Sequence, residues 1–460
     1  MQKMKEKTVD MTEGRLLEKI IRFAVPVCLG LLFQQLYNLA DTIIVGRMLG
    51  VNALAGVGST TGLTFFAFSI STSLGNGFSV SISQRFGAGD DKGIKKYFGN
   101  ALVLSAILSV VLTIITTFLA KPVLDLTKTP DEIHSFAYKY VIVIFAGLVC
   151  TVFYNLLAAS LRALGDSRTP VIVLIIASVV NIVLDIVMIG TLKMGVAGAA
   201  LATVASQLIS VLFLVNYIVH NNESLKITTK DLRIGHDVSA EQLMTAIPMA
   251  LQGVVIALGI LIVQAAINAM GTVYVAGSTA GNKLYGIMSA SIDSVCQAMI
   301  PIAGQNYGAG KHDRIDKGLR LVNIIGWSLT IVLSVFAYFF GPAMMGLFID
   351  TAEAEVITYG HQFLLFYVMG YGFLTIQMSF CFALQGSGKA KLTVASGILE
   401  TAGRLVGAVV IAGMYGYIGV CLALPLAWVF TSAYIIPAYI LCRKRMTGNK
   451  TNFNSEAAII

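Results

Sequence analysis

Two aspartates lie inside long apolar stretches of this 460-residue chain, where a charged side chain is costly. Asp41 falls within residues 29–45 and Asp185 within residues 171–189. A carboxylate near the centre of a bilayer costs a few kcal/mol unless it is protonated, paired or facing water, so such acids usually mark an ion or proton pathway. The alternative is a hydrogen bond that packs two helices. Asn181 precedes Asp185 by four residues and shares its face of a helix, which favours the pathway.

The elements that carry these acids are expected to be membrane-spanning helices. Hydrophobic residues make up 56% of the chain and charged residues 12%, which excludes a soluble globular domain. Because a helix needs about 20 apolar residues to cross about 30 Å of hydrocarbon, the sequence predicts an all-α, polytopic membrane protein with twelve transmembrane helices. Their expected ranges are 20–46, 53–85, 97–120, 133–161, 170–190, 195–219, 241–270, 272–306, 317–340, 355–385, 391–412 and 416–441.

The basic residues predict the orientation, because positive charge concentrates in short cytoplasmic loops. With both termini in the cytoplasm, most of the 32 basic residues fall on the cytoplasmic side, including Lys19, Arg85, Arg162 and Lys311. The chain is therefore expected to be a multi-pass protein of the cell membrane, in contact with lipid. Its net charge of +8 follows from this topology, and no nucleic-acid partner is needed to explain it.

The remaining chemistry-bearing residues do not indicate an enzyme. The five histidines lack the spacing of a metal site, and the stretches near Gly56 and from Gly277 to Lys283 lack the ending of a phosphate-binding loop. We therefore expect no catalytic residue and no cofactor. The six cysteines are expected to be small packing residues: Cys28, Cys150, Cys296, Cys381, Cys421 and Cys442.

The chain repeats itself at a shift of 221 positions. This shift aligns the QxxGAG element at 84–89 with that at 305–310, and Gly195 with Gly416. Each half then holds six helices, and an even number returns the chain to the same side. The two repeats are therefore expected to be parallel, related by an axis along the membrane normal. The expected domains are a cytoplasmic tail at 1–15, an N-lobe at 16–220, a cytoplasmic linker at 221–240, a C-lobe at 241–442 and a cytoplasmic tail at 443–460.

These elements resemble the MATE family of multidrug and toxic compound extrusion antiporters. The resemblance rests on the repeated QxxGAG element, on LRALGDSRTP at 161–170 and on its weaker counterpart LQGSG at 384–388. It covers about residues 16–441 and implies two six-helix lobes forming a V. It also implies export of cationic or amphipathic organic compounds in exchange for protons or sodium, by alternating access of the lobes. We expect a monomer.

The family's cation-coupling site maps onto the first lobe. Asp41 in helix 1 matches its acid there, Asn181 and Asp185 in helix 5 match its N-x-x-x-D pair, and Thr203 in helix 6 matches a hydroxyl ligand. Two carboxylates, an amide oxygen and a hydroxyl make an all-oxygen site that suits sodium or a shared proton. The two acids are expected to hold a proton near neutral pH unless a cation replaces it.

The second lobe departs from the family pattern. Many members carry acids in helices 7 and 10, whereas no acid lies deep in either helix here; their interior polar residues include the amides Gln252, Gln264, Asn268, Gln362 and Gln377. Its charges are instead Lys283 and Asp293 in helix 8, and Glu400 and Arg404 in helix 11. Glu400 and Arg404 are four residues apart, which predicts a structural salt bridge within one helix. Asp293 is expected either to attract a cationic substrate or to pack helix 8.

The residues expected to contact substrate lie near Asp41 and in helices 4, 8 and 10. Met and aromatic side chains make adaptable apolar walls that also attract cations, and packing is the alternative role for each of them. The expected substrate cavity is lined by Gln34, Tyr37, Asn38, Tyr154, Asn155, Met288, Asp293, Met299, Tyr371 and Met378.

Pro26 lies on the same helix as Asp41, about four turns before it. A proline inside a helix removes a hydrogen bond and bends the helix. Pro26 is therefore either a hinge whose angle follows the charge at Asp41 or a static kink.

The leading hypothesis is a proton- or sodium-coupled efflux antiporter for organic cations. A lipid-linked oligosaccharide flippase of the same superfamily is the alternative, and it would favour a larger basic cavity to hold a pyrophosphate. An integral-membrane enzyme would need clustered His, Asp or Ser at an interface, and the sequence shows no such cluster.

Overall fold

The computed structural model describes residues 9–127, 129–346 and 353–448, which form helices joined by short connections. This confirms the all-α fold. Within these residues, eight uninterrupted helices are long and apolar enough to cross a membrane, and three pairs bent at short breaks raise the number to eleven. Together with α2 (Leu16–Leu49), they form the twelve expected spans. Parts of the two expected tails, residues 1–8 and 449–460, lie outside the described residues.

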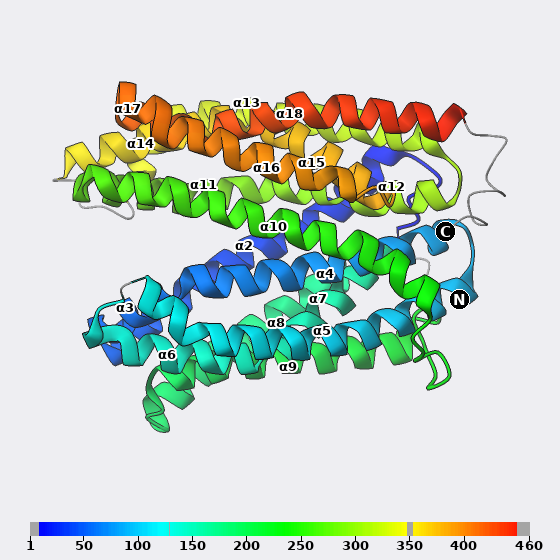
Figure 1. Ribbon diagram of the computed structural model, residues 1–460, viewed down its shortest axis with the longest axis horizontal. Coiled ribbons are helices and arrows are strands. Elements are labelled where there is room, and N and C mark those ends of the chain that lie inside the picture. Colours follow the sequence, from blue (N-terminus) through cyan, green and yellow to red (C-terminus); the bar gives the residue numbers. More distant parts are fainter. Residues whose placement is uncertain (1–8, 128, 347–352, 449–460) are drawn as a thin grey trace.

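The twelve spans divide into two lobes of six (Figure 1). The first six are α2, α3 (Val51–Ser59) with α4 (Thr61–Gly87), α5 (Asp91–Leu126), α6 (Asp131–Ala146) with α7 (Leu148–Ala163), α8 (Arg168–Asp185) with the π-helical segment η1 (Ile186–Thr191), and α9 (Gly195–Asn221). The second six are α10 (His236–Met270), α11 (Thr272–Gln297) with α12 (Met299–Gly308), α13 (His312–Met345), α14 (Ala354–Met369) with α15 (Tyr371–Gly386), α16 (Lys391–Leu405) with η2 (Val406–Ile411) and α17 (Ala412–Tyr415), and α18 (Tyr417–Gly448).

The irregularities of the helices repeat between the halves. The fourth span bends by 49° between α6 and α7, and the tenth bends by 45° between α14 and α15. Both breaks fall at a glycine, Gly147 and Gly370. The fifth and eleventh spans each contain a π-helical segment in their second half, η1 and η2, and α17 follows η2. The internal repeat seen in the sequence is therefore also a repeat of backbone geometry.

The helix that opens the first half, α2, passes from one lobe to the other. Near its start, Ile20 and Phe23 are buried in a core cluster made mostly of second-lobe residues. Beyond Pro26, Gly30 packs against Val171 of α8, and Val45 packs against the first lobe. Beyond Pro26, Val27 and Leu31 still pack against the second-lobe cluster and Gln35 lies against Gly286 of α11, so the contacts of α2 with the two lobes overlap from Val27 to Gln35.

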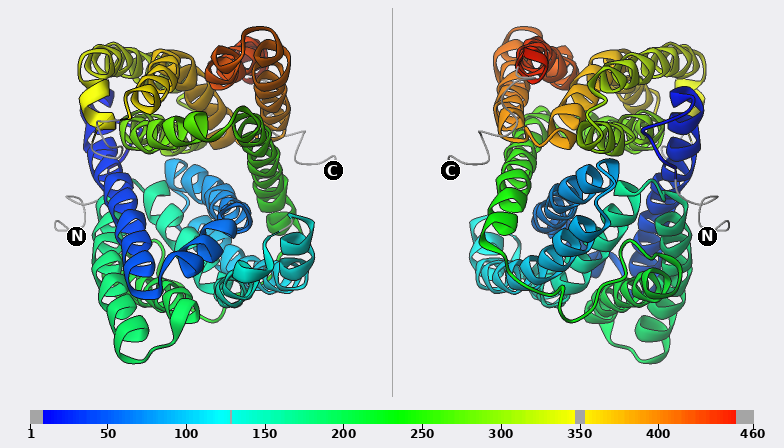
Figure 2. Two further views of the ribbon diagram at one scale, coloured as in Figure 1. Left: turned by 90° about the vertical axis from the view of Figure 1, so that its left-hand side faces the viewer. Right: turned by 90° about the vertical axis from the view of Figure 1, so that its right-hand side faces the viewer.

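The helix that opens the second half, α10, makes the opposite crossing. Near its start, Gln242 accepts a hydrogen bond from Asn100 of α5 at 2.9 Å and donates one to Ser81 of α4 at 3.2 Å. Further along α10, Gln252 donates a hydrogen bond to Ser396 of α16 in the second lobe at 3.0 Å. Figure 2 shows α2 (blue) and α10 (green) on opposite sides of the molecule, each reaching from one lobe to the other. These two helices join the lobes.

The two QxxGAG elements pack directly against each other. A Cβ atom on Gly87 would lie 1.8 Å from the carbonyl oxygen of Gln305, and one on Gly308 would lie 1.9 Å from that of Gln84. Only glycine allows backbones to approach this closely. We call this packing the motif contact. It joins the lobes at the end of the molecule where α2 begins and α18 ends (Figure 1).

Side chains of the same elements reinforce the motif contact reciprocally. Gln305 Nε2 donates to the carbonyl of Ala163 at 2.8 Å, where α7 ends in the first lobe. Gln84 Nε2 donates to the carbonyl of Gly386 at 2.9 Å, where α15 ends in the second lobe. Each glutamine therefore caps the fourth helix of the opposite repeat and satisfies a terminal carbonyl.

The chain preceding α2 covers the motif contact. The Val9 amide donates to Gly165 of the first lobe at 3.3 Å. The fully buried Met11 donates its amide to Gln305 Oε1 at 2.7 Å, and its carbonyl accepts from Asn306 at 3.1 Å and from Arg314 Nε at 2.8 Å. Residues 9–14 therefore bind both lobes at the end where they meet.

We predict that Gly308→Val opens the motif contact. Its side chain overlaps the Gln84 carbonyl, and because overpacking costs about 1–3 kcal/mol, access to the space behind the contact should rise about tenfold. The measurement is labelling of Ser79→Cys by a membrane-impermeant maleimide added at the N-terminal side. Gly58→Val is the matched control, since a Cβ atom there meets nothing within 4 Å. Unchanged labelling in Gly308→Val would show that the contact does not close the molecule.

Candidate functional site

The four residues expected to couple a cation come together in the first lobe. Asp185 ends α8 and directly precedes η1, and π-helical turns of this kind are frequent at functional sites. Asn181 and Asp185 are fully buried. With its amide oriented to satisfy both neighbours, Asn181 donates to Asp185 Oδ2 at 3.0 Å and accepts from the amide of Thr203 at 3.1 Å. The Thr203 hydroxyl donates to the carbonyl of Ala199 at 3.2 Å.

Asp41 approaches this group from α2. Its carboxyl group lies within hydrogen-bonding reach of the Asp185 carboxyl group, although the two residues are far apart in the chain. Each aspartate has a buried Oδ1 atom that accepts no hydrogen bond from the described residues. Carboxylate oxygens are acceptors only, so a buried pair of them needs a donor or a cation. One proton between the two carboxyl groups, or one monovalent cation, supplies it.

Two tyrosines complete the surroundings of the acids. Tyr37, which the sequence analysis assigned to the substrate cavity, lies one turn before Asp41 on α2 and beside Thr203. Tyr140 of α6 packs against the cluster of Val45, Ile189 and Ala199, which holds the α2 residue one turn after Asp41. Nothing in the sequence spacing indicated Tyr140, because its helix carries no other polar residue of the site. The one feature of the sequence that could have indicated Tyr140 was a tyrosine in the middle of a span, in the lobe that also contains both acids.

The second lobe buries the expected ion pair. Arg404 Nη2 donates to Glu400 Oε1 at 2.6 Å, and both side chains are 4% exposed. This confirms the salt bridge within one helix. Gln377 of α15 donates to Glu400 Oε2, and Arg404 Nη1 donates to the carbonyl of Ile256 at 3.4 Å. Arg404 packs closely against Gly259 of α10, where a Cβ atom would lie 3.0 Å from the Cδ and Nη1 atoms of the arginine. These bonds tie α16 to α15 and α10.

The other expected substrate contacts are distributed over three environments. Gln34 and Asn38 are exposed on α2. Asn155 accepts from Thr72 at 3.3 Å and donates to the carbonyl of Thr151 at 2.9 Å, which packs α7 within the first lobe. Asp293 accepts from Ser289 at 3.4 Å and is partly buried.

The second-lobe apolar residues of the expected cavity lie in a packed core. Met299 and Tyr371 have no exposed surface, Met288 is buried, and Met378 packs against the same cluster. The Tyr371 hydroxyl donates to the carbonyl of Tyr285 at 3.0 Å. Packing alone accounts for these four positions in this conformation.

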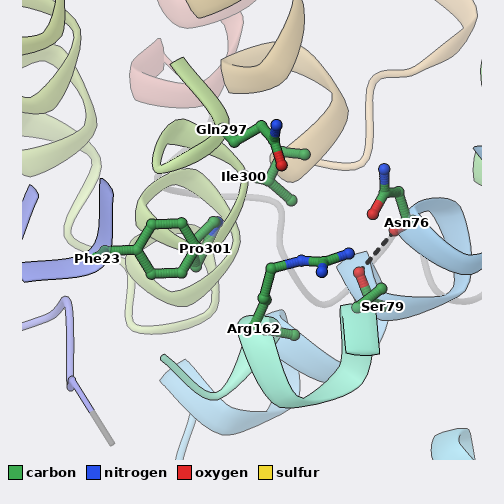
Figure 3. A pocket seen from close by; sticks show the side chains of 9 residues that line it. Phe23, Asn76, Ser79, Arg162, Gln297, Ile300 and Pro301 are labelled. Atoms are coloured by element: carbon green, nitrogen blue, oxygen red, sulfur yellow. Dashed lines mark hydrogen bonds between the residues drawn. The ribbon is translucent and has the colours of Figure 1, made fainter. Parts of the chain in front are cut away.

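A small pocket between the lobes contains a residue whose location the sequence analysis missed. Figure 3 shows Arg162 of α7 projecting toward Asn76 and Ser79 of α4, while Gln297 and Pro301 come from the other lobe. Arg162 was counted among the basic residues that orient the chain. Its place directly after the fourth apolar stretch, 133–161, was one signal, and the structure extends the helix to Ala163. Another was that the aligned position in LQGSG is the neutral Gln385. The pocket is lined by Phe23, Asn76, Ser79, Ala159, Arg162, Ala163, Gln297, Ile300 and Pro301.

The residues that the structure describes do not form a metal site built from several His, Cys, Asp or Glu side chains. No group of three or more such side chains among them is placed to hold a metal ion. The oxygen atoms around Asp41 and Asp185 remain the arrangement suited to a small cation or a proton.

Comparisons with known proteins agree with the arrangement of the lobes. The MatE family matches the chain over residues 26–187 and 248–410. The probable multidrug resistance protein YpnP of Bacillus subtilis is 31% identical over 80% of this chain and 82% of its own. The multidrug export protein MepA of Staphylococcus saprophyticus is 22% identical over 94% and 95% of the two chains. A crystal structure of MATE in complex with MaL6 superposes with a TM-score of 0.88, at 24% identity over 97% and 100% of the chains.

We predict that Glu400→Gln lowers stability and leaves ion coupling in the folded protein intact. Removing one partner of a buried ion pair costs about 3–5 kcal/mol, because the remaining charge is left uncompensated. The loss should appear as a lower thermal midpoint in detergent. Glu355→Gln, at an exposed acid in the first turn of α14, is the matched control. Uncoupled transport at an unchanged midpoint would instead place part of the coupling in the second lobe.

Proposed function

Because the chain belongs to the MatE family, whose two matched segments fall one in each lobe, we propose that it exports amphipathic organic cations in exchange for protons or sodium. The multidrug exporters among its relatives support this assignment. In this proposal the lobes are residues 16–220 and 241–442, joined by a linker at 221–240. The protein acts as a monomer in the cell membrane, with both termini and the motif contact on the cytoplasmic side, consistent with the distribution of its basic residues.

One observation carries the proposal: the contact between Asp41 and Asp185, each with a buried oxygen that lacks a donor. A proton or cation between them attaches the second half of α2 to α8. Without it, two carboxylates in contact repel each other. The charge state of the pair therefore biases where this half of α2 lies.

Helix α2 can transmit that bias because its two halves have different neighbours. The part before Pro26 is packed in the core of the second lobe, and the part after it, once past Gln35, carries Asp41 into the first. Proline removes a backbone hydrogen bond and weakens the helix at this point. We propose that α2 bends at Pro26 when the acids change charge, and that this bend couples the ion to the rocking of the lobes.

The oxygen atoms favour a proton over sodium. The Asn181 oxygen accepts from the Thr203 amide, and among the buried oxygen atoms of these four residues that the structure describes, the two Oδ1 atoms lack a partner. A proton shared by the two carboxyl groups needs only these two side chains, whereas a hard cation would need further oxygen ligands to turn toward it.

The flippase alternative finds less support. A pyrophosphate carries several negative charges and calls for a cluster of cationic side chains. Among the residues that line the inter-lobe pocket, Arg162 is the single cation.

We predict that Asp41→Asn abolishes exchange with little effect on folding. The amide keeps the shape of the carboxyl group and donates permanently to Asp185, so the site can no longer load and release a proton. Ion-driven dye efflux from proteoliposomes should fall about a hundredfold, and Asp185→Asn should impair it in the same way. Asp237→Asn, at a fully exposed acid, is the control. Full activity of Asp41→Asn would rule out this coupling site.

We predict that export of a monovalent cation follows the chemical gradient of the coupling ion. One-for-one exchange moves no net charge, although a single charge crossing the membrane is worth about 2.3 kcal/mol per 100 mV. Collapsing the pH or sodium gradient should stop export, and collapsing the potential alone should have little effect. The measurement is efflux of such a dye with ionophores selective for each gradient. Export driven by the potential at zero ion gradient would mean that more than one ion enters per cycle.

A further inference from the structure

Arg162 occupies an unusual position for a basic residue of a transporter proposed to export cations. It lies on the last turn of α7, and its guanidinium enters the inter-lobe pocket rather than the water beyond the helix end (Figure 3). The next residue, Ala163, gives its carbonyl to Gln305 across the motif contact. The guanidinium therefore lies directly behind the contact that closes the molecule.

This guanidinium has no acidic partner among the residues that the structure describes. The ion pairs there involve other basic residues, and the half-buried Arg162 makes no hydrogen bond with its five N–H groups to the residues that the structure describes. A charge removed from water is costly unless it is paired and hydrogen-bonded. An arginine at this position is explained if a bound ligand supplies the anionic partner of its guanidinium.

The neighbours of Arg162 are dipoles rather than competing charges. Asn76 and Ser79 lie on the first-lobe wall, and the Ser79 hydroxyl donates to the Asn76 carbonyl at 2.7 Å. Gln297 supplies an amide from the second lobe. The opposite charge is found one turn from Gln297 on the same face of α11, at Asp293, a rise of about 6 Å along the helix.

We propose that this pocket binds the carboxylate or phosphate group of the transported compound, so that the preferred substrates are zwitterions whose anionic group contacts Arg162 and whose cationic group lies toward Asp293. The inference rests on the proposed function for the compound being transported. A planar guanidinium suits such groups because it donates two parallel hydrogen bonds to two oxygens. An anion there would contact both lobes immediately behind the motif contact, where a compound entering through the opened contact arrives first.

The test compares rhodamine 110, which carries a free carboxylate, with rhodamine 123, its methyl ester. Binding of each dye to the full chain in lipid nanodiscs is followed by fluorescence anisotropy. The unaltered protein should bind the acid about tenfold more tightly than the ester. Arg162→Gln should erase that preference by weakening the acid alone, leaving the Kd of the ester within about twofold.

Three further variants make the result specific. Glutamine is compatible with this position, since Gln385 occupies the aligned place in the second repeat. Arg162→Lys keeps the charge and should retain part of the preference. Arg168→Gln removes an exposed positive charge six residues away and should change nothing. Asp293→Asn should weaken the binding of both dyes, since both carry a cationic ring system.

The outcomes separate this inference from the proposed function. Equal binding of acid and ester by the unaltered protein, or equal weakening of both by Arg162→Gln, would overturn the anion site. An intact preference without ion-driven efflux of either dye would contradict antiport and leave the anion site standing. Displacement of rhodamine 110 by dioctanoyl phosphatidic acid, in an Arg162-dependent manner, would identify a lipid headgroup as the source of the anion. Displacement by a soluble organic acid alone would identify the exported compound.

Discussion

The close approach of two glycine-containing backbones is the constraint around which this molecule is organised. At Gly87 and at Gly308, a backbone carbonyl of the opposite lobe occupies the space that a side chain would need. The contact is made by two copies of the same element, so its geometry is reciprocal, and the glutamine of each copy bonds the fourth span of the other half. Two lobes joined in this way meet at this end of the molecule. The alternating access proposed for the protein requires a joint that can be formed and broken without rearranging the interior of either lobe.

The crossing helices α2 and α10 explain how a small event in one lobe can involve both. Each begins in one core and ends in the other, so any rotation of the lobes must change the shape of both helices or their packing. In α10 the crossing is held by amides, Gln242 on one side and Gln252 on the other. In α2 a proline precedes the stretch that contacts both lobes, and Asp41 lies beyond that stretch. The asymmetry between the lobes therefore concerns the connecting helices as much as the charged residues.

The sequence predicted the architecture well because its signals are local or repetitive. Twelve apolar stretches, an even number per repeat and a constant shift are enough to specify two parallel six-helix halves. The grouping of Asp41 with Asp185 needed the family resemblance, since spacing alone relates only Asn181 to Asp185. The substrate residues were harder to predict because a methionine in a membrane helix has the same pattern in a core as in a cavity, and Met299 and Tyr371 turned out to be core residues. Arg162 was hard to predict for a different reason. A charge near the end of a helix suggests a loop residue, but the direction of its long side chain depends on neighbours from the other repeat.

The chain that precedes α2 has a consequence for how the protein is made. Met11 bonds to Gln305, 294 positions later, and the first half of α2 is buried among second-lobe residues. At a synthesis rate of about 5–20 residues per second, the first helix waits about 15–60 s in the membrane before its partners exist. During that interval the first lobe can assemble from α3 to α9, while the beginning of α2 remains without its final packing. The packing of residues 9–27 is therefore completed among the last steps of folding, although this segment is synthesised before the rest of either lobe.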